Sequence, residues 1–254
     1  MMVAVAGKGG VGKTTCSALI LRGLLRIGVR PLLAVDADPN ANLHLLLALL
    51  LPRPLGSLRE EMLPPASRGS AGSVAMPDRI AAEVQRRVAE GAAVDLVAMG
   101  RGEGPGCYCY VNSLLRDTLS RLAGGYRAVV VDNEAGMEHL SRRNVRRIDH
   151  LVLVGDPSPR GLSAVAAIRD LARELALPVG NAWLLLNRQY AGTEERSGPG
   201  PGLPLLAELP HDPSLPAWEA TGRSFLELPD GSSAAADAVA SAVAGMLGAR
   251  GGVW

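Results

Sequence analysis

Cysteine is scarce in this chain of 254 residues, and long hydrophobic runs are absent. Three cysteines are too few for a framework of disulfide bonds, and residues 1–10 lack the basic start and long apolar run of a secretory leader. The longest leucine-rich run, residues 45–51, is too short to span a bilayer. We therefore expect a protein of the reducing cytoplasm with no membrane partner.

An excess of charge of either sign is also missing. The formal net charge is +1 at pH 7, so the whole-molecule field does not favour nucleic acid or an anionic membrane surface. Aromatic residues make up 3% of the chain and hydrophobic residues 48%, which predicts a core of Leu, Val and Ala. We expect no nucleic acid as a partner.

Short apolar runs alternate with helical patterns from end to end. Buried strands are predicted at residues 3–6, 32–35, 96–99, 128–131, 151–154 and 183–186. Helical spacing of Leu and Ala covers residues 14–25, 111–122, 161–175 and 233–247, whereas residues 64–77 and 192–204 are expected to be loops. The alternation predicts a single α/β domain over residues 1–254, with a mostly parallel sheet and helices on both faces.

A glycine-rich motif follows the first predicted strand. Residues 7–15, GKGGVGKTT, match G-x-x-x-x-G-K-[ST] between a strand and a helix. The glycines let backbone N–H groups approach phosphate oxygens, and the next helix directs its positive end at the same charge. The alternative is a glycine-rich turn without a ligand. The predicted nucleotide-binding residues are Gly9, Gly10, Val11, Gly12, Lys13, Thr14 and Thr15.

The chain is thus predicted to be a P-loop NTPase that binds ATP or ADP with Mg²⁺. Lys13 is expected to neutralise the β- and γ-phosphates and so to be catalytic, and the hydroxyl of Thr14 to bind Mg²⁺. A second lysine, Lys8, lies inside the loop. With it the loop resembles the deviant-Walker class of dimeric ATPases, which includes the MinD and ParA proteins and the nitrogenase iron protein. The resemblance implies that Lys8 is catalytic and reaches across a homodimer interface to the partner's nucleotide, as an arginine finger does; the alternative is a solvated lysine.

Acidic residues follow two of the predicted strands. Asp36 and Asp38 come after residues 32–35, and Asp132 comes after residues 128–131. The carboxyl ends of strands beside a phosphate loop are where Mg²⁺ and the attacking water lie. Asp36 and Asp132 are predicted to support the Mg²⁺ ion, and the resemblance implies that Asp38 orients or activates the water. Turn-capping is the alternative for Asp36 and Asp38.

The residues after Asp132 form a predicted switch. The amide of Gly136 is expected to sense the γ-phosphate, so that exchange of ATP for ADP moves residues 133–143 as switch II. His139 lies in this switch and either contacts a metal or client, or is simply solvated. Arg142, Arg143, Arg146 and Arg147 form a basic cluster, which is a solvated face or a docking site for an acidic client or the neighbouring subunit.

The base pocket is predicted from the resemblance. Asn187, at the end of the sixth predicted strand, is similar to the asparagine that reads adenine in this class. Residues 209–213, LPHDP, resemble the loop on the other side of the base, which makes Pro210 and Asp212 candidates. An asparagine at a strand end can alternatively cap a turn.

Two of the three cysteines lie one residue apart. Cys107 and Cys109 belong to PGCYCYVN, residues 105–112. In an extended segment residues i and i+2 project to one side, but two ligands do not close a structural metal site. A homodimer with its two-fold axis at this point would supply four thiolates, which suit tetrahedral Zn²⁺ or square-planar Ni²⁺. A disulfide and a pair of inert thiols are the alternatives, and Cys16 is expected to be a small buried residue.

Residues 104–116 and 132–143 resemble the CooC-type proteins, the ATPases linked to nickel insertion into carbon monoxide dehydrogenase and acetyl-CoA synthase. The resemblance implies an ATP-dependent homodimer that carries Ni²⁺ or Zn²⁺ between paired Cys107 and Cys109 and serves a nickel enzyme as client. The Gly- and Pro-rich insertion at residues 191–204 departs from the family pattern.

Functions of other classes stay open. A MinD- or ParA-like positioning ATPase would need a membrane-targeting tail or a DNA-binding face, and residues 233–247 contain neither a cation nor a bulky aromatic residue. An iron–sulfur scaffold or electron-transfer ATPase would bridge a cluster between subunits. The nitrogenase iron protein does so with two cysteines far apart in sequence, whereas here they are adjacent.

Overall fold

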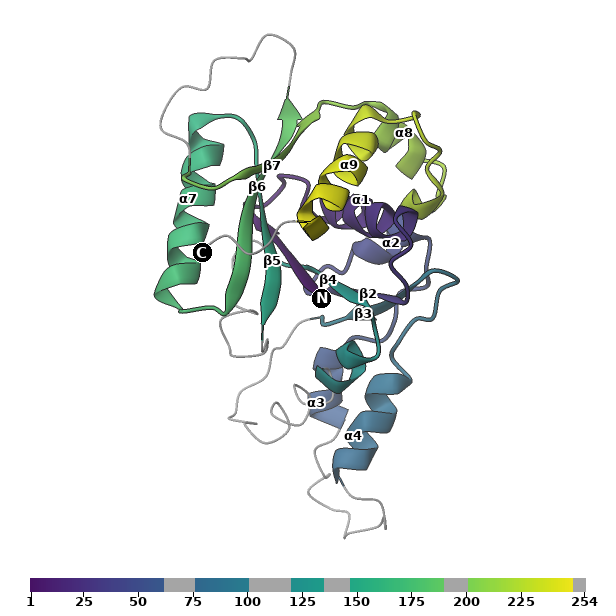
Figure 1. The fold of residues 1–254 in the computed structure, drawn as a ribbon. Coiled ribbons are helices and arrows are strands. Elements are labelled where there is room, and N and C mark those ends of the chain that lie inside the picture. The colour runs from purple at the N-terminus through teal and green to yellow at the C-terminus, as the bar shows by residue number, and fades with distance from the viewer. Residues whose placement is uncertain (62–75, 101–119, 135–146, 190–200, 249–254) are drawn as a thin grey trace.

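A computed structural model describes residues 1–61, 76–100, 120–134, 147–189 and 201–248. Within these ranges seven strands form one sheet in the order β3-β2-β4-β1-β5-β6-β7 (Figure 1). Every neighbouring pair is parallel. The strands are β1 (Met2–Gly7), β2 (Leu32–Asp36), β3 (Val94–Ala98), β4 (Ala128–Asp132), β5 (Ile148–Gly155), β6 (Val179–Gln189) and β7 (Leu205–Pro210).

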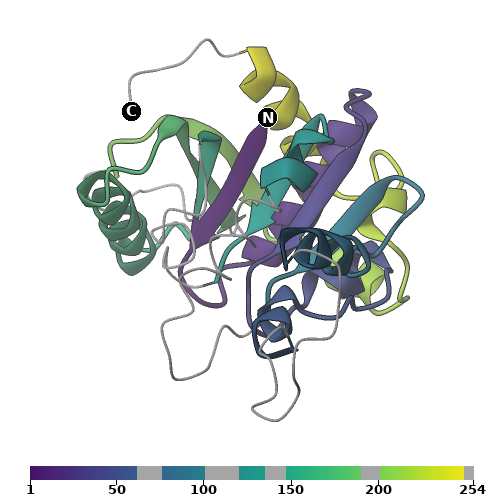
Figure 2. The same ribbon diagram turned by 90° about the horizontal axis from the view of Figure 1, so that it is seen from below.

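Helices cover both faces of this sheet. In Figures 1 and 2, α7 lies on one side of the strands, and α1 and α9 lie together on the other. The α-helices are α1 (Lys13–Arg26), α2 (Leu43–Leu47), α3 (Leu58–Glu61), α4 (Met76–Gln85), α7 (Pro159–Glu174), α8 (Ser214–Glu219) and α9 (Ala234–Gly248), and the 3₁₀ turns are η1 (Leu55–Ser57) and η2 (Phe225–Glu227). The predicted single-domain α/β fold is confirmed.

The central strand β1 shows how the sequence fixes the two layers. Val3 and Val5 belong to the core on the α1 side, whereas Ala4 and Ala6 pack with residues of α7. Side chains alternate between the two faces of a strand, and both faces of β1 are covered, so an unbroken apolar run is required here. This strand leads directly into the glycine-rich loop, which is therefore anchored in the middle of the sheet.

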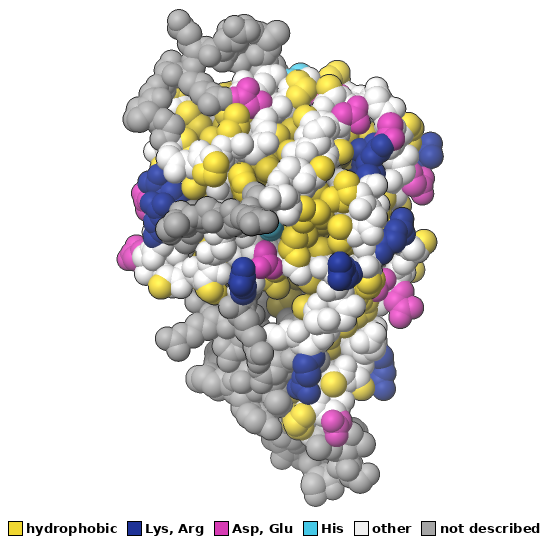
Figure 3. Space-filling model, viewed as in Figure 1, with side chains coloured by type: hydrophobic (Ala, Val, Ile, Leu, Met, Phe, Trp, Pro, Cys, Tyr) yellow, Lys and Arg dark blue, Asp and Glu magenta, His cyan; other side chains and the backbone are white. Residues whose placement is uncertain are grey.

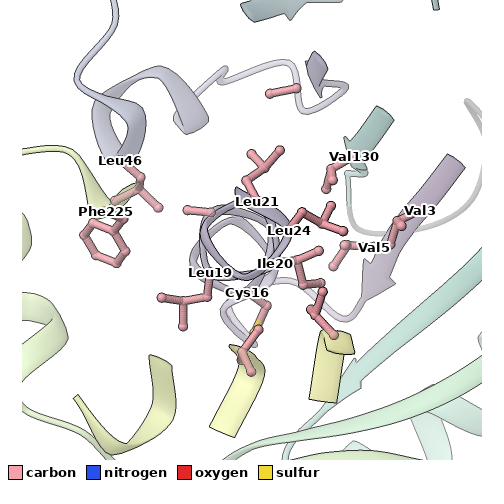
Figure 4. Packing of buried hydrophobic residues seen from close by; sticks show 14 of the residues in the cluster. Val3, Val5, Cys16, Leu19, Ile20, Leu21, Leu24, Leu46, Val130 and Phe225 are labelled. Carbon is pink, nitrogen blue, oxygen red and sulfur yellow. The ribbon is translucent and has the colours of Figure 1, made fainter. Parts of the chain in front are cut away.

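Helix α1 is buried from Cys16 to Leu24, mostly among apolar residues. Figure 4 shows it end-on, with Leu19, Ile20 and Leu24 directed outward among side chains from neighbouring elements. Helix α9 packs against it so closely that a Cβ on Gly23 would lie 3.3 Å from the side chain of Val243. A larger residue at position 23 would therefore push the two helices apart.

Cys16 lies in the same core. It is 1% exposed, and burial followed by the charge of Asp132 raises the pKa of its thiol to about 12. The thiol therefore stays protonated at neutral pH and is a poor metal ligand. The expectation that Cys16 is a small buried residue is confirmed.

The six predicted strands are all present, and their ends differ from the predicted ones by a few residues. Strand β7 was not predicted, and α4 begins at Met76, inside the segment expected to be a loop. Residues 120–124 are helical, which agrees with the end of the predicted helix 111–122. Among the described residues, no helix is long and apolar enough to cross a membrane.

Candidate functional site

Polar residues from three neighbouring strands meet at one edge of the sheet. Because the strands are parallel, the loop after β1, the turn after β2 and the end of β4 all lie at the carboxyl edge. Asp132 is in register with Val5 on one side and with Asp36 on the other. The backbone N–H of Ala37 donates to the carbonyl oxygen of Asp132 at 2.9 Å, which joins the turn to β4. The topology therefore brings the predicted acidic residues to the glycine-rich loop.

The loop has the backbone shape that a phosphate cradle needs. Gly10 and Gly12 have φ angles of 74° and 94°, in the left-handed region that favours glycine. Gly12 is the N-cap of α1 and offers no side-chain acceptor to the first turn, so the helix end remains available to an anion. The Nζ atom of Lys13, a residue that is 7% exposed, donates to the carbonyl oxygen of Lys8 at 3.2 Å, and the side chain of Lys8 is exposed.

Asp132 lies beside two hydroxyl groups of α1. Its Oδ1 accepts a hydrogen bond from Ser17 Oγ at 3.0 Å, and the hydroxyl of Thr14 also bonds to it. Burial raises the pKa of Asp132 to about 6; the hydroxyl bonds oppose this, and the charge of Asp36 adds to it. A buried carboxylate near a second carboxylate and a threonine hydroxyl is an oxygen donor set that fits Mg²⁺. Ser17 was missed by sequence reasoning, although it lies one helical turn after Thr14.

Asp36 and Asp38 hold the turn that follows β2. The two carboxylate oxygens of Asp36 accept the backbone N–H groups of Asp38, at 3.1 Å, and Leu43, at 2.8 Å. Burial raises the pKa of Asp36, and these hydrogen bonds oppose the shift. The carboxylate of Asp38 accepts the N–H of Asn40 at 2.8 Å. Both residues make the turn-capping bonds considered as their alternative, while their roles toward Mg²⁺ and water stay predictions.

Asn187 contacts the phosphate loop itself. Its Nδ2 donates to the carbonyl oxygen of Val11 at 2.8 Å, and its Oδ1 accepts the N–H of Arg188 at 2.9 Å. A Cβ on Gly12 would collide with the same Nδ2 atom. The structure thus gives Asn187 a loop-holding role that the sequence did not indicate, and adenine reading stays a prediction.

Asp212 ties the region after β7 to two helices. One carboxylate oxygen accepts the N–H and the hydroxyl of Ser214 at the start of α8, and the other accepts Ser233 Oγ at 2.7 Å and the N–H of Ala235 at 3.2 Å. Partial burial alone would raise the pKa of Asp212, but the hydrogen bonds outweigh it and hold the pKa below its ordinary value. Pro210 is the last residue of β7. Contact of either residue with a base stays a prediction.

Several predicted site residues lie outside the described residues. They are Cys107, Cys109, Gly136, His139, Arg142, Arg143 and Arg146. Arg147 is described, and its Nε pairs with Asp149 at 2.9 Å. The described ranges contain no group of three or more His, Cys, Asp or Glu side chains that could hold a metal ion. On the face in Figure 3, cationic and anionic side chains are interspersed over the described part.

Comparison with known proteins identifies relatives that bind nucleotides. The model of the CobQ/CobB/MinD/ParA nucleotide binding domain matches residues 2–225. An uncharacterized ATP-binding protein of Methanocaldococcus jannaschii is 35% identical over 235 residues, which cover 91% of this chain and 92% of that protein. The carbon monoxide dehydrogenase accessory protein CooC of Rhodospirillum rubrum is 35% identical over 189 residues, 70% of this chain and 71% of that protein.

A solved structure with the same fold is the MinD cell division protein of Aquifex aeolicus. It superposes with a TM-score of 0.72 at 18% identity, covering 100% of this chain and 99% of that one. At this identity the similarity concerns the fold.

Proposed function

Since this chain belongs to the CobQ/CobB/MinD/ParA nucleotide-binding family, we propose that it is an ATP-hydrolysing metal carrier for a nickel enzyme. The chain is an ATP-binding NTPase of the MinD/ParA type. In the proposal two copies bind Ni²⁺ or Zn²⁺ as cargo between their Cys107 and Cys109 thiolates. The client is carbon monoxide dehydrogenase or acetyl-CoA synthase.

One observation carries the proposal: a phosphate loop and two thiols one residue apart occur together in a chain similar to a carbon monoxide dehydrogenase accessory protein. The topology supports a link between the two. Strand β3 ends at Ala98, at the same edge of the sheet as the glycine-rich loop, and residue 101 follows Gly100 directly. The described chain before the cysteines therefore ends, at Gly100, on the nucleotide side of the molecule.

In the proposal, each residue at the carboxyl ends of β1, β2 and β4 has a separate role in binding or hydrolysing ATP. Backbone N–H groups of the loop and of the first turn of α1 bind the phosphates, and Lys13 neutralises their charge. Thr14 and Asp132 would hold Mg²⁺, with Asp36 in support, and the ion when bound supplies charge neutralisation at the phosphates. Asp38 orients the attacking water. Lys8, whose side chain is exposed, reaches the nucleotide of the partner copy.

Metal release requires a change of geometry. Structural Zn²⁺ sites in peptides are worth roughly 10–16 kcal/mol, so a four-thiolate site does not give up its ion readily. In the proposal ATP closes the dimer and brings two cysteine pairs together, and hydrolysis opens it. Each chain then keeps only two thiolates, which is an incomplete site, and the ion passes to the client.

The test is metal analysis combined with mass measurement in solution, with and without ATP. The expected result is one Ni²⁺ or Zn²⁺ per two chains, present in the ATP-bound dimer. The variant Cys107→Ser/Cys109→Ser should lose the metal and keep ATP binding. Cys16→Ala is the matched control, because that thiol is buried and protonated, and it should keep the metal.

Metal uptake that persists in the double serine variant, or a full complement of metal on a monomer, would overturn the proposal. Other outcomes identify the remaining functions. Iron and a brown colour after anaerobic purification would indicate an iron–sulfur scaffold or electron-transfer protein. A retardation of DNA in a gel shift assay that weakens steeply as the salt concentration rises would indicate a ParA-like partition protein.

A further inference from the structure

A cavity of about 540 Å³ lies at the end of α1 that is opposite the phosphate loop. It is lined by the last turns of α1 with Arg30 beyond them, by the end of α2 and the turn after it, by residues 91–94 at the start of β3, and by η2 with Ser224. Helix α1 has 14 residues, which at 1.5 Å per residue place its two ends about 20 Å apart. The cavity is therefore separate from the nucleotide site, and its volume lies within the range of small-molecule pockets.

The polar lining of this cavity is mainly cationic. Arg22, Arg26 and Arg30 line it, and among the described residues of the lining Glu227 alone is acidic. The carboxylate of Glu227 is 3.3 Å from the guanidinium of Arg223, outside the cavity lining, and Asp230 pairs with Arg22 and Arg26. Three arginines thus share these few acidic groups, which favours an anion in the cavity.

Arg22 is the most unusual of the three arginines because it is 1% exposed. Its Nε and Nη2 donate to the carbonyl oxygen of Leu228 at 3.0 and 2.8 Å, and Nη2 also reaches Asp230 at 2.8 Å. Its Nη1 is buried and has no acceptor among the described residues. A buried donor without an acceptor is costly, so Arg22 adds an incompletely compensated positive charge beside the cavity. The exposed guanidinium groups of Arg26 and Arg30 are the ones shaped and placed to receive a carboxylate or phosphate.

The remaining walls of the cavity are apolar. Leu25, Leu47, Leu49, Val94 and Leu226 all contribute to its lining. We propose that the cavity binds a small organic anion, whose carboxylate or phosphate group contacts the arginines and whose apolar body packs on the leucines. The proposal concerns a second site and is independent of the metal carried by the chain.

A purely structural role for the arginines makes a different prediction. Arg26 lies in the last turn of α1, where a cation stabilises the helix dipole, and Arg22 fastens residues 228–230 to the helix. If this were their whole role, the cavity would take up no anionic ligand with fixed stoichiometry.

The probe for the test is 8-anilinonaphthalene-1-sulfonate, which joins an anionic group to an apolar body and fluoresces when bound. We expect one site per chain, retained at saturating Mg-ATP, with benzoate or phenyl phosphate competing. Arg26→Gln/Arg30→Gln should raise the dissociation constant at least tenfold; both residues are exposed, so the fold should survive. Ala92→Trp, at an exposed lining position, should block the site in the same way.

Arg79→Gln/Arg86→Gln, which removes one exposed arginine from α4 and another directly after its last residue, Gln85, is the control with the same change of charge and should bind the probe normally. Unchanged affinity in the Arg26/Arg30 variant would overturn the proposal. Displacement of the probe by Mg-ATP, or binding without a fixed stoichiometry, would overturn it as well.

Discussion

The Nδ2 atom of Asn187 lies 2.8 Å from the carbonyl oxygen of Val11, although 176 positions separate the two residues in the chain. The bond joins the end of β6 to the middle of the phosphate loop. A side chain on Gly12 would collide with the same amide group. The shape of the loop thus depends on a residue from the other half of the sequence.

Asn187→Ala should weaken the binding of ATP and GTP alike by about fivefold, because one hydrogen bond is worth roughly 1 kcal/mol net. The measurement is fluorescent nucleotide titration with both nucleotides. A further loss confined to ATP would measure the adenine contact that the sequence predicts. Unaltered affinity for both nucleotides would contradict the loop-holding role.

Gly12→Ala should weaken nucleotide binding and destabilise the fold by about 1–2 kcal/mol through left-handed strain, and by about 1 kcal/mol more because the Asn187 amide must move and lose its hydrogen bond to Val11. Gly10→Ala is the matched control: its φ is also positive, but a Cβ there would meet nothing within 4 Å. Urea unfolding should show only the strain for Gly10→Ala. The double variant Gly12→Ala/Asn187→Ala should recover part of the stability, and the absence of any recovery would refute the collision.

Asp132→Asn should make the metal-free protein more stable at pH 7.5 while impairing Mg²⁺-dependent ATP binding. Burial raises the pKa of Asp132 to about 6 in the folded protein, from an ordinary value of 3.8, so the folded state binds the extra proton. Stability should therefore fall as the pH rises from about 4 to about 6, by about 2–3 kcal/mol at most.

Urea unfolding of the nucleotide-free protein with chelator, at pH values from 4 to 8, measures this dependence. The asparagine variant should show a smaller loss of stability over that interval. The deciding quantity is the difference in unfolding free energy between the wild type and Asp132→Asn. If this difference stays the same from pH 4 to pH 6, the titration does not belong to Asp132.

Lys8→Ala and Lys13→Ala should separate hydrolysis from binding. Lys13 is 7% exposed and its ammonium group lies against the loop, so its removal should abolish ATP binding. The Lys8 side chain is exposed, and its loss should leave ATP affinity within about twofold while lowering the hydrolysis rate at least about 100-fold, as for a missing arginine finger. Phosphate release and mass in solution with ATP are the measurements. Normal hydrolysis by Lys8→Ala would refute the action in trans.

The interior strands could be predicted from sequence because both of their faces are buried. Strand β4, for example, is buried at all five positions and reads AVVVD. Strand β7 lies at the edge of the sheet, and its sequence LLAELP has an exposed first residue and an exposed glutamate, so it has no buried run to mark it. Helix α2 was missed because it has only five residues.

The candidate site also has one part that the sequence could predict and another that it could not. The phosphate loop is a local motif, so a single stretch of sequence revealed it. The bonds of Asn187 to Val11 and of Asp212 to the start of α9 join distant segments, and no spacing rule predicts them. The burial of Arg22 was unpredictable for the same reason, because its acceptor, Leu228, is 206 positions away.

The enclosure of α1 has a practical consequence for watching this protein at work. The sheet packs on one flank of the helix and α9 is fitted against Gly23 on another, so we expect α1 and α9 to stay together during turnover. A dye or spin label on the exposed face of α9, at Ser241 or Ala244, should therefore show little change. Leu45 and Leu50, which follow the Asp36–Asp38 turn and point into solvent, are better attachment points. A change in the fluorescence or spectrum of a label at Leu45 or Leu50 would show that ATP binding or hydrolysis moves the segment after the Asp36–Asp38 turn.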